Sequence, residues 1–425
     1  MQPMKRVVVT GLGFITSIGN NREQVLRSLR ECRTGVEPFP ELNDADVPVK
    51  LAGTIKGFQF PTPDFEDWTY PPDYRLTREQ LRPMSPNSLY AFCAMQQAIR
   101  EARLTPDLVS SPRTGLMCAS GGSMWMAYES LHTMFTRGVS RCQPMSIVNG
   151  IPGSLYINLV ATFKIKGGSL GFSSACSSSA HATGVACDNL RLGRQDIVFV
   201  VGAEDCNKVS ILPFASARAL SLGTDPEKTP CAFDVKRDGF VGTGGAAALV
   251  LEELEYARRR GASIIAEVLG WGQSSDGYNV LAPEPSGEGL KRAMEEALRD
   301  ADLRPEEIDY INAHGTSTPI GDVAECRAIH SMFQNGKIPW VSSTKSLTGH
   351  GLSLSGAMEA AFSCLALQEK FTPVSAHITQ LDPECGIVPI VAKPIADAPR
   401  VALKNSSAFG GSNVSLILRR WENDR

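Results

Sequence analysis

The chain has 425 residues, of which 43% are hydrophobic and 20% charged, and its formal net charge is −3 at pH 7. This is the composition of a globular protein, and it gives no reason to expect binding to nucleic acid or to an anionic membrane. The eleven cysteines include no Cys-x-x-Cys pair, which argues against a zinc ribbon and against a disulfide scaffold. No segment approaches the roughly 20 apolar residues of a membrane span, and the first apolar run is too short for a signal peptide. We therefore expect a cytoplasmic protein with reduced thiols.

The N-terminal sequence predicts a strand at residues 6–10, which is followed by Gly11-Leu12-Gly13, and then a helix at 21–30. A dinucleotide-binding fingerprint would need a small third residue where Thr16 stands, so we reject that site. Residues 38–83 are rich in proline, aspartate and aromatic side chains with little periodicity. This segment is expected to be an excursion that packs on the body or on a partner.

The rest of the first half alternates helices and strands. Ser85-Pro86 predicts the start of a helix that continues to about residue 102. The following elements in chain order are a strand at 115–118, a glycine-rich turn, a helix at 154–163, a helix that begins after Cys176, and a strand at 197–201.

The second half repeats this pattern. A strand at 264–269 ends in Gly270-Trp271-Gly272, a helix covers 290–301, and residues 98–109 resemble residues 296–308. A final pair of strands is expected at 387–391 and 401–403. Alternating helices and nearly continuous apolar strands indicate a duplicated α/β fold with a mainly parallel sheet covered on both faces. Equivalent turns of the two copies would then meet at a shared centre.

Cys176 lies in a turn of small residues, Gly171 to Ser179, directly before a predicted buried helix. Unpaired N–H groups and the helix dipole at this position favour a thiolate, and the small neighbours let a substrate approach the sulfur. A free cysteine is also commonly a small buried hydrophobic residue, so this turn alone leaves both interpretations open.

Turns of the second half supply further chemistry: His314, Lys345, His350, and Phe409 before Gly410-Gly411. Either histidine alone fits a structural imidazole, but both together with Cys176 favour a site. Two neutral imidazoles would serve as hydrogen-bond donors to a developing negative charge. A Gly-x-Ser-x-Gly elbow is absent from the sequence, which argues against an α/β-hydrolase.

Two acidic residues, Asp322 and Glu359, could be buried partners of Lys345. Each could equally be a solvated acid near a helix end.

Seven motifs follow one another along the chain: SSACSSSAHATG, DIVFVVGAED, FDVKRDGFVGTGG, SDGYNVLAPEPSGEG, NAHGTSTPIGD, STKSLTGH and FGGSN. Together, and in this order, they resemble the β-ketoacyl-[acyl carrier protein] synthases of the elongating type I/II kind, within the thiolase-like superfamily, and most of all type I. The resemblance implies a duplicated five-layer α-β-α-β-α sandwich with mixed, mainly parallel sheets. Residues 1–262 would form the half with the nucleophile and residues 263–425 the half with the two histidines.

The resemblance also implies the reaction, an acyl transfer followed by decarboxylative condensation with malonyl-carrier protein that lengthens a fatty-acid or polyketide/polyene chain by two carbons. Cys176 would carry the acyl chain as a thioester, with His314 and His350 polarising the malonyl thioester carbonyl and Lys345 as electrostatic support. The remaining implied roles are the oxyanion hole, formed by backbone N–H groups of Cys176 and Phe409; the gate, Phe409 with Gly410; the phosphopantetheine arm contacts, Thr316 and Thr318; and the supporting acids, Asp322 and Glu359. No cofactor and no metal are expected.

Three departures from the family pattern concern the gate and the acyl pocket, not the chemistry. Ser407-Ala408 stands where the family has Phe-Gly, Ser353 replaces the usual glycine after His350, and Met124-Trp125 are bulkier than the residues expected after the strand at 115–118. We expect an altered acyl preference.

The partners implied are acyl- and malonyl-loaded acyl carrier protein and a second subunit, in a homodimer or in a heterodimer with a related chain. Carrier protein is acidic, so Arg75, Arg78 and Arg82 are candidates for a basic rim, although each alone fits a solvated charge. A non-catalytic chain-length factor would lack the nucleophile, a thiolase acting on coenzyme A esters would use a second cysteine near residues 407–413, and a papain-like hydrolase would need an oriented His-Asn pair.

Overall fold

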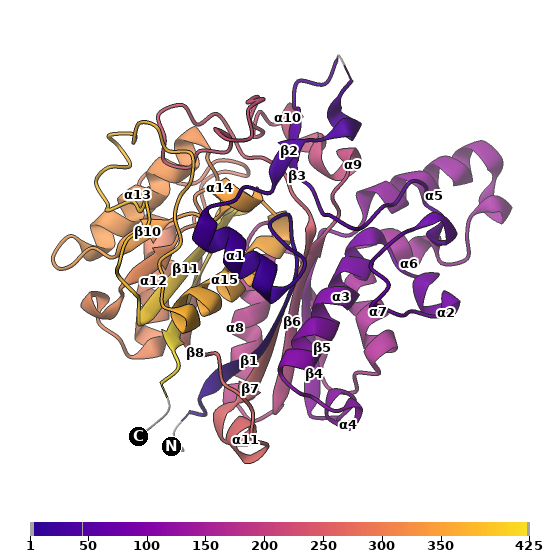
Figure 1. Cartoon of the computed structure of the whole chain (residues 1–425), viewed down its shortest axis with the longest axis horizontal. Coiled ribbons are helices and arrows are strands. Elements are labelled where there is room, and N and C mark those ends of the chain that lie inside the picture. The colour runs from indigo at the N-terminus through magenta and orange to yellow at the C-terminus, as the bar shows by residue number, and fades with distance from the viewer. Residues whose placement is uncertain (1–3, 45, 423–425) are drawn as a thin grey trace.

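The computed structural model describes residues 4–44 and 46–422. Most of the first half lies on the right in Figure 1 and most of the second half on the left, with the strands between them. The ten main strands form one sheet in the order β10-β9-β11-β12-β8-β1-β7-β6-β4-β5. Their bounds are β1 Val7–Ile15, β4 Thr114–Ala119, β5 Ser169–Phe172, β6 Ile197–Glu204, β7 Gly245–Glu253, β8 Ala266–Ser275, β9 Tyr310–Asn312, β10 Trp340–Ser342, β11 Val401–Ala408 and β12 Ser412–Arg420.

The sheet consists of two five-strand halves with the same internal order. Numbered within each half, both read 1-5-4-2-3 outward from the centre, with antiparallel pairing at the inner three strands and parallel pairing at the outer three. The halves join where β1 pairs with β8, antiparallel, over Val7–Val9. The expected duplication is therefore confirmed. We propose the division between residues 262 and 263, in the loop between α11 and β8, as the boundary of the two copies.

Helices form three layers around the two half-sheets. The central pair, α8 and α15, packs on strands of both halves, and α15 is buried along nearly its whole length because it has helices or strands on all sides. On the outside, α3 and α7 cover the first half and α12 and α13 the second. This is the expected α-β-α-β-α arrangement. The expectation of a mainly parallel sheet is wrong, because the last two strands of each half run antiparallel to each other beside the first, so that only the outer pairs β6-β4, β4-β5, β11-β9 and β9-β10 are parallel. The helix bounds are α1 Arg22–Glu31, α2 Arg78–Leu81, α3 Pro86–Glu101, α4 Pro106–Val109, α5 Met124–Arg137, α6 Ser146–Gly150, α7 Ser154–Phe163, α8 Ser178–Arg191, α9 Lys208–Ile211, α10 Pro213–Ser216, α11 Leu254–Arg259, α12 Glu288–Ala301, α13 Pro319–Phe333, α14 Lys345–Thr348 and α15 Ser355–Glu369.

Glycine pairs mark equivalent contacts in the two halves. The prediction that strands end at Gly11-Leu12-Gly13 and Gly270-Trp271-Gly272 is wrong, because β1 and β8 run through them. A Cβ at Gly13 would lie 1.8 Å from the Ala94 carbonyl oxygen of α3, and one at Gly272 would lie 2.3 Å from the Ala293 carbonyl oxygen of α12. The glycines therefore let an outer helix approach the strand backbone.

Other predicted elements are confirmed or corrected by the structure. The helices after Asn21, Ser85 and Gly153 and the strand at residues 197–201 are present. The predicted strand at 387–391 is wrong, since only Ile390 forms an isolated bridge there. Residues 412–420, which were not predicted, form β12 instead. The segment 38–83 is mostly irregular, as expected, with a small second sheet formed by β2 (Val36–Pro38) and β3 (Leu51–Gly53).

No helix in the described part of the chain is long and apolar enough to cross a lipid bilayer.

Candidate active site

The turn that carries Cys176 connects β5 to α8, and its serines fix its shape. The backbone N–H of Ser174 donates to the Ser178 hydroxyl, and the Ser177 and Ser178 hydroxyls donate back to carbonyl oxygens of the turn. Ala175 adopts a φ of 49°, in the left-handed region that non-glycine residues rarely occupy. Cys176 follows at once, two residues before α8, and its side chain is 8% exposed.

Burial disfavours the thiolate that was expected at Cys176 from its place before a helix. Burial raises its pKa to about 11, and the nearby Lys345 charge opposes that shift only in part. Loss of hydration therefore outweighs the attraction of the Lys345 charge for a thiolate. The thiol needs hydrogen-bonding groups around it to react at neutral pH.

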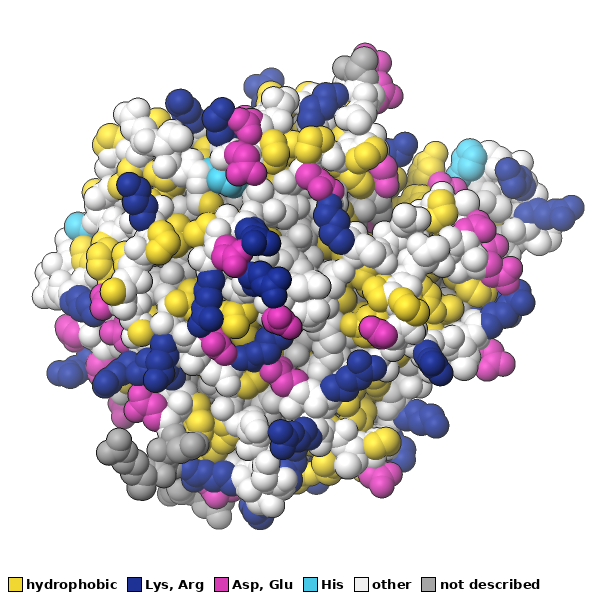
Figure 2. Space-filling model, in the orientation of Figure 1, with side chains coloured by type: hydrophobic (Ala, Val, Ile, Leu, Met, Phe, Trp, Pro, Cys, Tyr) yellow, Lys and Arg dark blue, Asp and Glu magenta, His cyan; other side chains and the backbone are white. Residues whose placement is uncertain are grey.

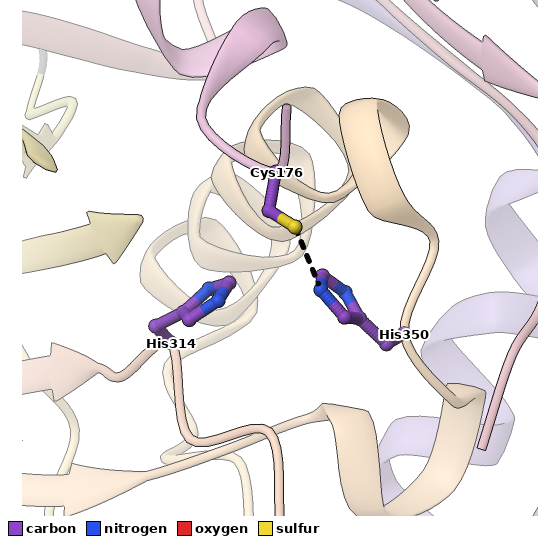
Figure 3. Close-up of side chains that lie close together, drawn as sticks. All are labelled: Cys176, His314 and His350. Atoms are coloured by element: carbon purple, nitrogen blue, oxygen red, sulfur yellow. Dashed lines mark hydrogen bonds between the residues drawn. The ribbon is translucent and has the colours of Figure 1, made fainter. Parts of the chain in front are cut away.

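Two histidines converge on this sulfur from the second half of the chain (Figure 3). His350 Nε2 lies 3.2 Å from Cys176 Sγ, and the rings of His314 and His350 meet edge to face with centroids 5.2 Å apart. Both imidazoles are buried. Burial, with the Lys345 charge as the second cause, holds the pKa of each well below its ordinary value, so both are neutral at pH 7.

His314 is placed by the loop after β9. Its backbone N–H and that of Gly315 donate to the Glu325 carboxylate of α13, at 2.9 and 2.7 Å. A Cβ at Gly315 would lie 2.7 Å from the Cβ of Ser343, so a glycine is needed for this close approach. The sequence analysis did not identify Glu325, because an acid inside a helix has no distinctive local pattern.

Lys345 stands behind His314. Its ammonium donates to the His314 carbonyl oxygen at 2.6 Å and to His314 Nδ1 at 3.4 Å, and it forms an ion pair with Glu359 at 2.5 Å. The other oxygen of Glu359 pairs with Lys404 of β11 at 2.9 Å. Glu359 is thus a buried partner of Lys345, as one of the two interpretations expected, but it is shared with a second lysine that sequence reasoning missed.

Asp322 does not contact Lys345. Its carboxylate accepts the backbone N–H groups of Ser317 and Phe233 and lies 3.6 Å from the Arg237 guanidinium. Burial raises its pKa to about 7. Asp322 therefore braces the loop that follows His314 and does not contact the reacting groups.

Family models for β-ketoacyl synthases match both halves, with the N-terminal domain at residues 4–257 and the C-terminal domain at 265–379. The 3-oxoacyl-[acyl-carrier-protein] synthase 1 of Haemophilus influenzae is 41% identical over 98% of this chain and 100% of its own. The enzyme of the same name from Escherichia coli K12 is 39% identical over 98% and 99%. The crystal structure of a β-ketoacyl synthase from Burkholderia phymatum superimposes with a TM-score of 0.90 at 34% identity, covering 99% and 100%.

The chain belongs to the β-ketoacyl synthase family. It is an acyltransferase-class enzyme of the fatty-acid synthase type with the thiolase-like ketosynthase fold, and its class of reaction is the elongating condensation. The fold, family and reaction class expected from the sequence motifs are confirmed, whereas the roles of individual side chains remain predictions.

A pocket of about 410 Å³ leads from the surface to Cys176, His314 and His350. Cys176 is the one cysteine that lines it in the described chain, and residues 407–413 supply no second thiol of the thiolase kind. Thr316 and Thr318, half-buried along its wall, have hydroxyls 3.0 Å apart. The pocket of this ketosynthase is therefore lined by one thiol, that of Cys176, and by the two threonine hydroxyls.

Phe409 lies at the side of the same pocket, before Gly410 with its φ of 80°. Its ring is 6.2 Å from Phe214, which meets Phe240 at 5.5 Å, and Phe240 meets the His350 ring edge-on at 5.0 Å. A continuous row of rings thus connects the predicted gate to His350. Phe214 and Phe240 were not identified from the sequence, although Phe240 lies within the matched motif FDVKRDGFVGTGG.

The predicted basic side chains Arg75, Arg78 and Arg82 are exposed but do not line this pocket. Arg78 pairs with Glu66, so part of its charge is compensated. Arg218, exposed at the wall of the pocket, is a cation that the sequence analysis did not select. The side of the molecule in Figure 2 mixes basic and acidic side chains.

The Cys176 sulfur and one ring nitrogen each of His314 and His350 lie within 4.8 Å of one another, close enough to share a metal ion in principle. The Lys345 ammonium beside His314 adds a positive charge that opposes a cation there. The geometry thus fits a hydrogen-bonding site better than a metal centre.

The raised pKa of Cys176 has a kinetic consequence. Its alkylation by iodoacetamide should become faster with every pH step from 7 to 10, because the thiolate fraction keeps growing until the pH approaches about 11. An unperturbed cysteine would level off above its ordinary pKa of about 8.5. Peptide mass spectrometry of the Cys176 adduct measures the rate, and a plateau near pH 8 would contradict the raised pKa.

Proposed function

We propose that Cys176 takes an acyl chain from acyl-carrier protein as a thioester and that His314 and His350 then assist its condensation with malonyl-carrier protein. The observation that carries this proposal is the meeting of Cys176 Sγ with His350 Nε2 at 3.2 Å, beside His314, at the end of one pocket. A nucleophile from one half of the chain and two neutral imidazoles from the other suit a reaction with a covalent intermediate.

In the acylation step, the sulfur attacks the thioester carbonyl of the acyl-loaded phosphopantetheine arm. The acyl group moves to Cys176, and the thiol proton ends on the departing pantetheine sulfur. Backbone N–H groups of Cys176 and Phe409 are proposed to stabilise the oxyanion. Thr316 and Thr318, on the pocket wall, are proposed to hydrogen-bond the arm.

In the condensation step, the malonyl thioester carbonyl accepts hydrogen bonds from His314 and His350. Carbon dioxide leaves, the electron pair of the broken bond passes into an enolate, and the enolate carbon attacks the acyl carbonyl on Cys176. The new carbon–carbon bond forms as the thioester bond to sulfur breaks, and the released Cys176 thiolate takes a proton from solvent to become the thiol again. Lys345 supplies positive charge behind His314 without touching the substrate, and Glu359 holds Lys345 in place.

Incubation of the protein with a panel of acyl-carrier proteins, followed by malonyl-carrier protein, tests this function. Intact-protein mass spectrometry should show an acyl adduct, and the second addition should release a β-ketoacyl-carrier protein two carbons longer. A folded protein that takes an acyl group from no donor would overturn the proposal.

The carrier protein is proposed as the partner at the pocket mouth. The solved complex described as a type II polyketide synthase acyl-carrier protein with its ketosynthase shares the fold of this chain, with a TM-score of 0.87 at 24% identity. Arg218 on the pocket wall, and the exposed Arg75, Arg78 and Arg82, supply positive charge for an acidic partner. We also propose a cytoplasmic location, in keeping with the absence of disulfide bonds among the eleven cysteines, all of which are described.

The acyl preference is proposed to differ from that of a housekeeping synthase. Ser353, where the family has glycine, donates to the buried carboxylate of Glu204, which also accepts the Gly121 N–H at 2.8 Å. The Glu204 charge contributes to the raised pKa of Cys176, so this polar pair lies near the acyl site. Met124 and Trp125 begin α5, not a turn as predicted. A chain-length and unsaturation profile equal to that of a housekeeping synthase would overturn this part of the proposal.

A homodimer is proposed through the edge of the sheet. Among the described strands, the outermost strand β5 pairs only with β4, and Leu170 on it is 52% exposed. In the same half of the chain, α5 and the segment after it expose further large apolar side chains: Tyr128, Leu131, Phe135, Val139 and Ile147. An uncovered strand edge with an apolar surface is typical of an interface.

Phe135→Asp should dissociate this dimer, because the ring is 80% exposed in the single chain and a carboxylate buried at an interface is costly. Light scattering after gel filtration should change from twice the 45.8 kDa chain mass to the chain mass. Leu192→Asp is the control, because it also replaces an exposed apolar side chain by aspartate, at a residue after α8 that is 66% exposed. This variant should stay dimeric. A wild-type protein that is monomeric alone but pairs with a related chain would favour the heterodimer instead.

A further inference from the structure

We propose that Ser355 is a positioning residue for His350: its hydroxyl donates to Nδ1 and so keeps the ring proton on Nε2, where His350 meets the substrate. This inference rests on the proposed condensation. It adds to that reaction a residue whose side chain lies behind the histidine and does not reach the pocket.

Ser355 is the first residue of α15 and is fully buried. Its Oγ lies 3.0 Å from His350 Nδ1, on the side of the ring opposite to Cys176. Among residues 4–44 and 46–422, no other hydrogen bond of this hydroxyl is found. In the described part of the chain, the Ser355 hydroxyl and His350 Nδ1 are therefore each other's hydrogen-bond partner.

The direction of this hydrogen bond follows from the cost of burial. If Nδ1 carried the proton and donated to Oγ, the hydroxyl proton of Ser355 would have no acceptor, and a buried unsatisfied donor costs about 1–3 kcal/mol. If the hydroxyl donates, its proton has an acceptor, and Nδ1 accepts that hydrogen bond through its lone pair and carries no proton of its own. The pKa of His350 is held low by burial and by the charges of Lys345 and Lys404, so the ring carries a single proton. That proton is then on Nε2.

His314 has an equivalent arrangement with a different donor. The Lys345 ammonium, which can only donate, lies 3.4 Å from His314 Nδ1. Both imidazoles thus have a donor behind Nδ1 and present N–H from Nε2. Two such groups beside Cys176 can hydrogen-bond one carbonyl oxygen, which is the arrangement that a developing enolate requires. A histidine held in the opposite tautomer would turn a bare nitrogen lone pair toward that negative charge.

The test compares Ser355→Ala, Ser355→Thr and the control Ser363→Ala. Ser363 is also buried on α15, but its hydroxyl donates to the Glu359 carbonyl oxygen, away from His350. Ser355→Ala should lower kcat for condensation about tenfold, the size of one buried hydrogen bond, with KM for malonyl-carrier protein unchanged and Cys176 acylation altered less than twofold. Ser355→Thr keeps the hydroxyl and should recover most of the rate, and Ser363→Ala should match wild type.

A second readout does not depend on activity. In protein labelled with ¹⁵N at its six histidines, the His350 signal, assigned by its loss in His350→Asn, should show a protonated Nε2 and an unprotonated Nδ1. Ser355→Ala should show a mixture of both tautomers. A protonated Nδ1 in wild type, or wild-type condensation by folded Ser355→Ala, would overturn the inference. A wild-type protein without any condensation would instead overturn the proposed function while the tautomer could still be determined.

Discussion

Cys176→Ala should form no acyl adduct with any acyl-carrier protein and should lose condensation by about 10⁴-fold or more, because it removes the only sulfur that lines the pocket in the described chain. The substitution deletes one atom from a small-residue turn whose shape depends on the hydroxyls of Ser177 and Ser178. The fold should therefore survive. Mass spectrometry of the intact protein after incubation with each donor measures the adduct.

Cys187→Ala is the matched control. Cys187 lies on α8 three turns beyond Cys176, fully buried in the core, and burial raises the pKa of its thiol to about 12. The Cys187→Ala variant should therefore be acylated on Cys176 at the wild-type rate. An acyl adduct that persists in Cys176→Ala and disappears in Cys187→Ala would show that Cys187, and not Cys176, is the nucleophile.

Glu359→Gln should lower the free energy of unfolding by about 3–5 kcal/mol, the usual loss when one partner of a buried ion pair is removed. The amide keeps the shape of the side chain but removes the carboxylate that forms an ion pair with both Lys345 and Lys404. Lys404→Met should be milder, because Glu359 and Lys345 still compensate one another. Urea unfolding followed by circular dichroism, at one fixed protein concentration, measures the difference.

An exposed ion pair provides the comparison. Glu23 pairs with Arg27 on the surface of α1, where the two side chains are 82% and 53% exposed. Glu23→Gln should change the free energy of unfolding by less than about 0.5 kcal/mol. Equal urea midpoints for Glu359→Gln and Glu23→Gln would show that the buried lysines lose their charge without the carboxylate.

Local sequence patterns predicted those parts of the fold that are decided locally. The helices α3 and α7 and the strand β6 follow from capping residues and apolar periodicity, and the structure has them. The strand expected at 387–391 is apolar enough, but its neighbours in space leave only a single bridge at Ile390. The strand β12 begins at Ser412, in a stretch that resembles a turn, because its pairing with β11 and β8 is decided by tertiary contacts.

The residues of the candidate site likewise fall into those that a local sequence pattern predicts and those that it does not. Cys176, His314, His350 and Lys345 lie in turns beside glycine or small residues, a pattern that the sequence displays. Ser355 and Lys404 are invisible to such reasoning, since a serine at a helix start is usually a cap and a lysine in a strand is usually exposed. The raised pKa of Cys176 also depends on how much of the chain covers it, which no local pattern specifies.

The repeated strand order has a further consequence for how the chemistry is divided. Cys176 precedes α8 after the third strand of the first half, and Lys345 and His350 precede α15 after the third strand of the second. The two helices touch at Gly356, where a Cβ would lie 2.3 Å from the Ala180 nitrogen. The same strand-to-helix loop is thus present twice, once in each half, and its two helices are in contact. Because the halves are joined in one chain, the two loops can carry different residues, a cysteine in one and a lysine and a histidine in the other, which two identical subunits could not do.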